Sequence, residues 1–141
     1  MVVVLCCGCF DVLHPGHLRH LLEAKALGDC LIVALAEDDV VNKGPGRPIH
    51  PWADRAAMLE ALQCVDRVVP MRNCAEAIRN VGPQFYVRGC DYNVERLPES
   101  DLFACHDVGA QIRFTKADKM SSAEVIRRVM TRGRSAHAPP S

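Results

Sequence analysis

The sequence predicts one α/β domain built on a mainly parallel, five-stranded sheet that is flanked by helices. Its 141 residues match the usual size of one domain, which excludes separate cofactor and substrate lobes. Short β-rich runs alternate with helical patterns, and the first two runs are apolar throughout, as expected of strands buried on both faces. Such alternation favours parallel strands joined by right-handed crossovers. We expect this domain to cover residues 1–131 and residues 132–141 to form a disordered tail.

Five segments rich in β-forming residues are the predicted strands, at residues 2–7, 31–35, 67–69, 85–88 and 111–114. Apolar residues at helical spacing follow the first strand, ending before Gly28, and follow Pro51. A capping box, Ser121-Ser122-Ala123-Glu124, predicts a last helix that continues through Val129. The connections between these strands are therefore expected to be helical.

The composition excludes several classes of partner. Lysine and arginine together number 17, as do aspartate and glutamate, so the formal net charge is zero and no basic field attracts nucleic acid. Hydrophobic residues form 49% of the chain, which supplies a core and disfavours disorder. The apolar run at residues 2–7 is too short to span a bilayer and lacks a basic flank. We therefore expect a soluble, cytoplasmic protein with no nucleic-acid or membrane partner.

The eight cysteines are expected to be mostly small, buried apolar residues. Most of them lie inside apolar runs and not between turns, so their spacing is not that of a disulfide framework. Cys6 and Cys7 are neighbours on the first predicted strand, where their thiols point to opposite faces. This arrangement suits neither a zinc site nor a redox pair.

Two histidines follow the first predicted strand, in a segment that begins at Gly8 and ends with His14-Pro15-Gly16-His17. Parallel sheets bind their ligands at the carboxyl ends of the strands. If a helix begins near Pro15, both imidazoles lie on one side of its first turn and face the same point. Gly16 would leave the free N–H groups of this turn open to an anion. The pattern predicts a phosphate site with two imidazoles.

Two other interpretations of these histidines stay open at this point. His14 could be a plain turn residue and His17 a solvated helix position. Alternatively, His14, His17 and His20 could hold zinc, although no cysteine or carboxylate is placed to complete that site.

Four segments, in order along the chain, resemble the H-x-G-H nucleotidylyltransferases, the cytidylyltransferase-like family. They are Gly8-Cys9-Phe10-Asp11-x-x-His14-Pro15-Gly16-His17, Lys43-Gly44-Pro45-Gly46-Arg47-Pro48, Val87-Arg88-Gly89-Cys90-Asp91-Tyr92 and Lys119-Met120-Ser121-Ser122. The resemblance extends to Arg128. It implies a compact Rossmann-like domain, commonly a homodimer, that transfers a nucleoside monophosphate from a nucleoside triphosphate to a phosphate ester and releases pyrophosphate. Mg²⁺ is then expected to bind through the triphosphate, with no metal site of the protein's own.

The resemblance also implies roles for individual residues. Catalysis is assigned to His14, His17 and Lys43, and acceptor binding to Asp11, Lys43 and Arg55. Nucleotide binding is assigned to Gly8, Cys9, Phe10, His14, Gly16, His17, Arg88, Gly89, Asp91, Tyr92, Lys119, Ser121 and Ser122. Such a reaction needs no protein nucleophile, because the acceptor's phosphate oxygen attacks the α-phosphorus in line and the protein positions and neutralises charge.

Simpler interpretations of some of these residues also exist. Lys43 taken alone is a solvated loop lysine and Arg55 a surface helix arginine. The segment Gly89-Cys90-Asp91 by itself signals only a turn, and Ser121 or Ser122 could serve as a plain helix cap.

Departures from the family pattern bear on the substrate. Cytidylyltransferases that act on glycerol 3-phosphate or on phospho-alcohols carry Arg-Thr-Glu-Gly where this chain has Lys116-Ala117-Asp118-Lys119, and favour arginine where it has Gln63. Two segments, residues 87–92 and 46–51, are more similar to the heptose 1-phosphate adenylyltransferase branch. We therefore favour ATP over CTP and a phosphorylated sugar or polyol as acceptor. Lys119 and Ala123 replace a glycine and a threonine of the last motif.

Several alternatives remain. A glycerol 3-phosphate-type cytidylyltransferase and an FMN adenylyltransferase belong to the same family. The altered last motif also allows a catalytically silent module that only binds nucleotides. A cysteine-based redox protein on a flavodoxin-like sheet is the alternative from another class, and it requires exposed, reactive thiolates.

Overall fold

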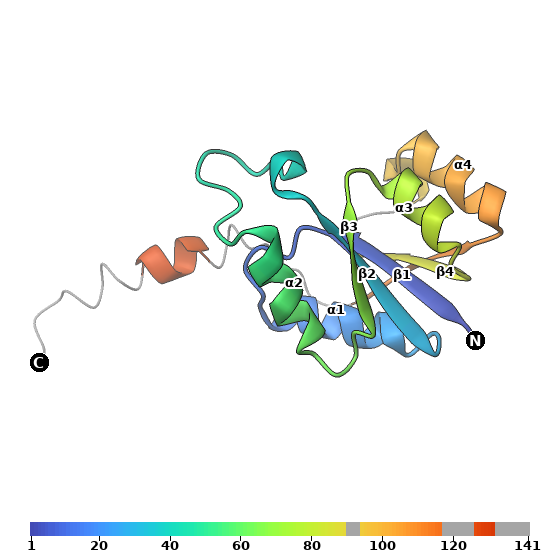
Figure 1. Ribbon diagram of the computed structural model, residues 1–141, viewed down its shortest axis with the longest axis horizontal. Helices are drawn as coiled ribbons and strands as arrows, with labels where there is room; N and C mark the ends of the chain where they lie inside the picture. Colours follow the sequence, from blue (N-terminus) through green and yellow to red (C-terminus); the bar gives the residue numbers. More distant parts are fainter. Residues whose placement is uncertain (90–93, 117–125, 132–141) are drawn as a thin grey trace, which may run out of the picture.

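The five predicted strands form one parallel sheet in the order β3-β2-β1-β4-β5 (Figure 1). The computed structural model describes residues 1–89, 94–116 and 126–131. The strands are β1 (Val3–Gly8), β2 (Cys30–Ala36), β3 (Arg67–Met71), β4 (Phe85–Arg88) and β5 (Gln111–Phe114). β1 and β2 are buried along most of their length, which confirms the prediction that both faces of these strands are covered. The single α/β domain with a parallel sheet is thus confirmed.

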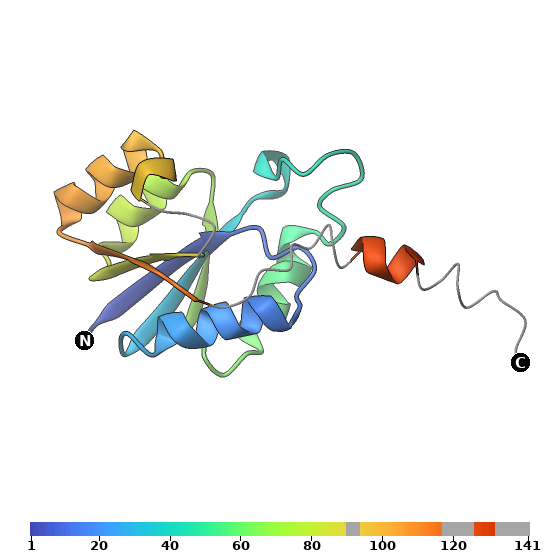
Figure 2. The same cartoon turned by 180° about the vertical axis from the view of Figure 1, so that it is seen from behind.

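Helices cover both faces of this sheet. α1 (Pro15–Lys25) and α2 (Trp52–Glu60) pack on one face, and α3 (Cys74–Val81) and α4 (Glu99–Val108) on the other, as the two opposite views show (Figures 1 and 2). Short 3-10 helices occupy Asp38–Val40 and Val94–Arg96. Residues 126–131 are helical, in agreement with the predicted last helix, whereas its capping box at residues 121–124 and the predicted tail lie outside the described residues.

Helix ends are set by local capping. α1 begins with Pro15 at its first position, where a missing N–H has no cost. α3 begins after Asn73, whose side chain accepts a hydrogen bond from the Glu76 amide at 2.8 Å. It ends at Gly82, which adopts φ 61°, a left-handed conformation that favours glycine.

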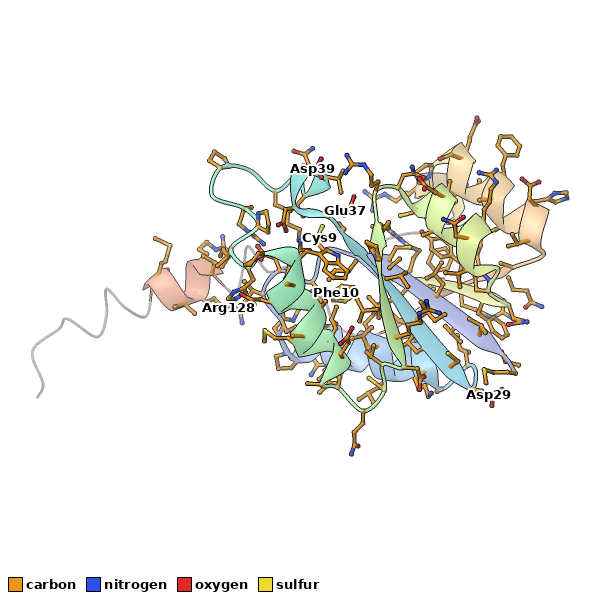
Figure 3. All side chains as sticks on the ribbon, in the orientation of Figure 1. Cys9, Phe10, Asp29, Glu37, Asp39 and Arg128 are labelled. Carbon is orange, nitrogen blue, oxygen red and sulfur yellow. The ribbon has the colours of Figure 1, made fainter. Side chains whose placement is uncertain are left out.

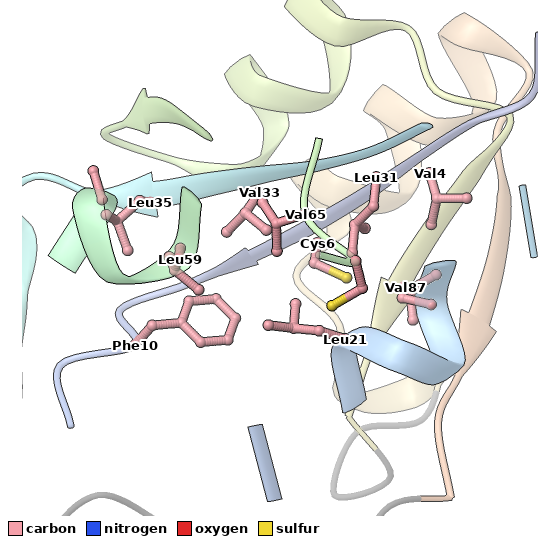
Figure 4. Close-up of a cluster of buried hydrophobic side chains, with 13 residues drawn as sticks. Val4, Cys6, Phe10, Leu21, Leu31, Val33, Leu35, Leu59, Val65 and Val87 are labelled. Carbon is pink, nitrogen blue, oxygen red and sulfur yellow. The ribbon is translucent and has the colours of Figure 1, made fainter. Parts of the chain in front are cut away.

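Two apolar clusters lie on the two faces of the sheet, and β1 contributes to both. Cys6 points into the cluster beneath α1 and α2, while Cys7 points into the cluster beneath α3 and α4. In the first cluster the ring of Phe10 lies beside Leu21 and Leu59 (Figure 4). The carboxyl end of β1 is therefore fixed from both sides by packing. In the described part of the chain, no helix is long and apolar enough to cross a membrane.

Candidate functional site

The predicted site residues gather where β1 ends, at the centre of the sheet. β1 lies between β2 and β4, so the segments that follow these three strands meet at one edge. Figure 3 shows Cys9 and Phe10, which follow β1, at the same end of the sheet as Glu37 and Asp39, which follow β2, while Asp29 lies at the opposite end. We call residues 8–17 the signature segment and residues 41–51 the acceptor-side loop.

His14 and His17 form a stacked pair at the start of α1. Their ring centroids are 3.8 Å apart and their planes differ by 25°. His14 is the N-cap residue, and its Nδ1 accepts a hydrogen bond from the Gly16 amide at 3.1 Å. A neutral imidazole that accepts at Nδ1 carries its proton on Nε2. The prediction that both rings lie on one side of the first turn is confirmed.

The donors of this site are imidazoles and not the backbone of α1. Pro15 has no N–H, the Gly16 amide is bonded to His14, and the His17 amide donates to the His14 carbonyl at 3.0 Å. These N–H groups are therefore not free, because the N-cap side chain and carbonyl already accept from them, and the contact of an anion with this turn stays a prediction. By contrast, His14 Nε2 and His17 Nδ1 are buried and have no hydrogen-bond partner among the described residues.

Both imidazoles are neutral at neutral pH. Burial, with smaller contributions from the neighbouring His14 and Lys43, lowers the pKa of His17 to about 3. Burial and the charge of Lys43 also lower the pKa of His14. The structure thus brings Lys43 of the acceptor-side loop within electrostatic reach of the two predicted catalytic histidines.

Phe10 fixes the turn that leads from β1 to the histidines. It adopts φ 44°, the only described residue other than glycine with a positive φ, and such backbone is costly unless packing holds it. Its ring is buried and contacts His17 edge-on, with centroids 5.2 Å apart. A Cβ on Gly8 would lie 2.8 Å from Cε2 of this ring, so the ring needs glycine at that position.

Asp11 ties the signature segment to the acceptor-side loop. It is 1% exposed, and Oδ2 accepts from Arg47 Nε at 2.6 Å and from the Ile49 amide at 2.8 Å, while Oδ1 accepts from the His50 amide at 2.9 Å. Burial raises the pKa of Asp11, but the two amides and the guanidinium outweigh it and leave the pKa below its ordinary value. The carboxylate is therefore ionised and holds the loop in place.

Arg55 joins three segments from a buried position in α2. It is also 1% exposed, so it is not the surface residue that a helix arginine usually is. Nη1 donates to the Cys9 carbonyl at 2.9 Å, Nε to the His50 carbonyl at 2.9 Å, and Nη2 to Asp38 Oδ1 at 2.6 Å. These bonds give Arg55 and Asp11 a structural role that the sequence did not indicate, while their contact with an acceptor stays a prediction.

The other predicted nucleotide ligands follow β4 and β5. Arg88 ends β4, with its Nη1 3.3 Å from the Tyr86 hydroxyl, and Gly89 follows at the same edge. Thr115, directly after β5, is bonded to α1 through His20 Nδ1, 2.7 Å from its hydroxyl. Asp91, Tyr92, Lys119, Ser121 and Ser122 lie outside the described residues, so their roles stay predictions.

The described residues do not form the zinc site considered above. No group of three histidine, cysteine or carboxylate side chains within them is arranged to hold a metal ion. His20 Nδ1 is bonded to the Thr115 hydroxyl at 2.7 Å.

Comparison with known proteins places this arrangement in a family. "Bifunctional protein HldE" of Aeromonas hydrophila is 39% identical over 136 residues, and HldE of Wolinella succinogenes is 45% identical over 104 residues. These matches cover 93% and 71% of this chain but only 28% and 22% of the relatives, so the chain spans about a quarter of their length. The crystal structure of a lipopolysaccharide core biosynthesis protein from Thermoplasma volcanium aligns with a TM-score of 0.69 at 28% identity, over 86% of this chain and 99% of that one.

A family model described as cytidylyltransferase-like matches residues 5–128. This range contains the stacked histidines, the acceptor-side loop and the ends of β4 and β5. The chain belongs to the cytidylyltransferase-like family.

Proposed function

We propose that this chain is an adenylyltransferase that transfers AMP from MgATP to a phosphorylated sugar and releases pyrophosphate. The observation that carries the proposal is the stacked pair, His14 and His17, in which His14 Nε2 and His17 Nδ1 are buried and have no hydrogen-bond partner in the described part of the chain. Buried polar atoms without partners are costly, so a ligand that supplies oxygen acceptors is the natural complement of this pair.

In this reaction the protein positions charge and forms no covalent intermediate. The acceptor's phosphate oxygen attacks the α-phosphorus in line, and the bond to the β-phosphate oxygen breaks. His14 Nε2–H is placed to donate to a phosphate oxygen, since Nδ1 already accepts from Gly16. Lys43, near both imidazoles, supplies the positive charge that the neutral histidines lack.

Mg²⁺ would enter as part of the nucleotide substrate. The carboxylate nearest to the histidines in sequence is Asp11, and both of its oxygens already accept hydrogen bonds from the acceptor-side loop. Triphosphate oxygens are therefore the ligands that we assign to the ion, which prefers phosphate and water in such sites.

The relatives support the choice of acceptor. The HldE proteins and the lipopolysaccharide core biosynthesis protein are similar to this chain over most of its described length. Together with the resemblance of residues 46–51 and 87–92 to the heptose 1-phosphate adenylyltransferase branch, they favour a sugar phosphate. The predicted homodimer is part of the same proposal, and sedimentation analysis of the purified protein tests it.

Calorimetric titration with MgATP and MgCTP, followed by a pyrophosphate-release assay, tests the proposal. We expect selective ATP binding and pyrophosphate release with a sugar 1-phosphate such as heptose 1-phosphate, but not with FMN. Selective CTP binding with turnover of glycerol 3-phosphate would replace the adenylyl assignment by the cytidylyl one. Nucleotide binding without turnover of any phosphate ester would instead indicate a catalytically silent module that only binds nucleotides.

A further inference from the structure

A polar cluster lies beneath α3 and α4, on the opposite face of the sheet from the stacked histidines, and Arg88 is the only one of its residues that the proposed reaction uses. It contains two thiols, Cys7 near the end of β1 and Cys74 at the start of α3, together with Tyr86, Arg88 and Asp101. Cys7 is 9% exposed and Cys74 is half-buried, so Cys74 is the more exposed of the two residues.

The two thiols are in direct contact. The Cys7 thiol is hydrogen-bonded to the sulfur of Cys74. Arg88 Nη1 lies 3.8 Å from Cys74 Sγ and 3.3 Å from the Tyr86 hydroxyl, which donates to Asp101 Oδ2 at 3.2 Å. Sequence spacing gave no sign of this pair, because β1 and α3 are far apart along the chain.

Several features favour a thiolate at Cys74. It is the first residue of α3, whose N-cap is Asn73, so it lies at the positive end of the helix dipole. The hydrogen bond from Cys7, with smaller contributions from Tyr86 and from the charge of Arg88, lowers the pKa of Cys74 to about 7 against the effect of burial. The pKa of Cys7 is raised by the same hydrogen bond and by burial, so Cys7 keeps its proton.

We propose that Cys7 and Cys74 are a site of reversible oxidation by hydroperoxides, at which Cys74 is attacked first and Cys7 resolves the product as a disulfide. The Cys74 thiolate attacks one peroxide oxygen, the O–O bond breaks, and Cys74 becomes a sulfenic acid while hydroxide leaves and takes a proton to form water. Cys7 then attacks the sulfenic sulfur, and its proton leaves with the sulfenic oxygen as a second water. Two thiols are oxidised and one peroxide is reduced to two waters.

Oxidation has a direct structural consequence at Arg88. In the disulfide, Cys74 no longer carries a negative charge beside the Arg88 guanidinium. The new bond also draws the start of α3 toward Cys7 on β1, and Cys7 directly precedes the signature segment. Cys105 offers a matched contrast in the same apolar cluster, because burial raises its pKa to about 11 and it is 2% exposed.

Peptide mapping of the reduced protein before and after treatment with hydrogen peroxide tests the proposal. We expect a cross-linked peptide that contains Cys7 and Cys74, about 2 Da lighter than the two reduced peptides together, and its loss after dithiothreitol. Cys105→Ser should leave this cross-link unchanged. Cys7→Ser should leave a sulfenic acid on Cys74, which dimedone traps, and Cys74→Ser should leave Cys7 reduced.

Alkylation of the wild-type protein gives a second measurement that needs no variant. Cys74 should be labelled by iodoacetamide at neutral pH, with a rate that rises at lower pH than expected of an ordinary thiol, whereas Cys105 should stay unlabelled in the native protein. The proposal is overturned if peroxide leaves Cys7 and Cys74 fully alkylatable, or if Cys74 is linked to a different cysteine. It is equally overturned if Cys7 is oxidised as readily in Cys74→Ser as in the wild type.

Discussion

The imidazole of His17 stacks on that of His14 at 3.8 Å, and burial together with this contact keeps the pair uncharged at neutral pH. Two imidazolium rings at this distance would repel each other, and burial also disfavours a charge on either ring. The pair therefore offers preorganised neutral donors, while the positive charge comes from Lys43 on the acceptor-side loop. Preorganised donors of this kind supply much of the rate enhancement of many enzymes.

His14→Ala and His17→Ala are each expected to lower kcat about a hundredfold or more, with a smaller effect on nucleotide affinity, because these donors act mainly on charge that develops in the transition state. Steady-state kinetics of pyrophosphate release, together with calorimetric nucleotide affinity, measure both quantities. His106→Ala is the control, since His106 is exposed on α4. An unchanged kcat in either site variant would rule out the assigned role.

The depressed pKa of His17 predicts that the protein loses stability in mild acid. Burial lowers this pKa from 6.5 to about 3 in the folded protein, so between these values the unfolded chain binds more protons than the folded one. The contribution is complete above pH 6.5 and falls as the pH decreases toward 3. When the pH falls from 7 to 5, the free energy of unfolding should decrease in the wild type, and it should decrease by on the order of 1 kcal/mol less in His17→Gln. Urea denaturation at both pH values measures this, and equal losses would contradict it.

Arg55→Lys should destabilise the protein by about 3 kcal/mol, because an ammonium cannot reach three divergent acceptors and would leave buried carbonyls unpaired. Arg79→Lys is the matched control, since Arg79 bonds to Asp107 at 3.0 Å on the exposed surface, where such pairs contribute little. Urea denaturation of the two variants makes the comparison. Similar losses from both would show that the three bonds of Arg55 do not stabilise the fold.

Asp11→Asn should loosen the acceptor-side loop without unfolding the domain. The amide replaces one acceptor oxygen by a donor, so one of the bonds from Arg47, Ile49 or His50 is lost together with the negative charge. We expect amide hydrogen exchange at Ile49 and His50 to accelerate about tenfold or more, since exchange reports local opening. Asp29→Asn, at the opposite end of the sheet, should leave both amides unchanged. If hydrogen exchange at these two amides is the same in Asp11→Asn as in the wild type, Asp11 does not hold the acceptor-side loop in place.

The strands were predictable because each is a short run of β-forming residues, and the helical connections between them predict parallel pairing, whereas the strand order and the register come from the structure. Two helices were not assigned individually. α3 has only eight residues, and the signal that could have located it is local: Asn73 and Glu76 at capping spacing, followed by Gly82. α4 begins directly after Pro98, which is likewise a helix-start signal.

The candidate site was likewise predictable from the sequence only in part. His14 and His17 are three residues apart, so helix geometry alone brings them together. The bonds from Arg55 to the Cys9 carbonyl and from the His50 amide to Asp11 join residues that are distant in the chain, and no spacing rule encodes such contacts. The sequence did not indicate that the first-turn amides of α1 bond to His14, because the N-cap position is usually filled by serine, threonine or aspartate and not by histidine.

The alternation of side chains along β1 separates two kinds of chemistry by a single peptide bond. Cys6 packs with the apolar cluster that contains Phe10, while Cys7 packs with the cluster that contains Cys74. A substitution at Cys6 or at Cys7 therefore changes the packing of one cluster and leaves the side chains of the other in place. Arg88 connects the two chemistries, because it contacts Cys74 and is also the predicted nucleotide ligand at the end of β4, so a thiol reaction on one face would be felt at the strand end through this one side chain.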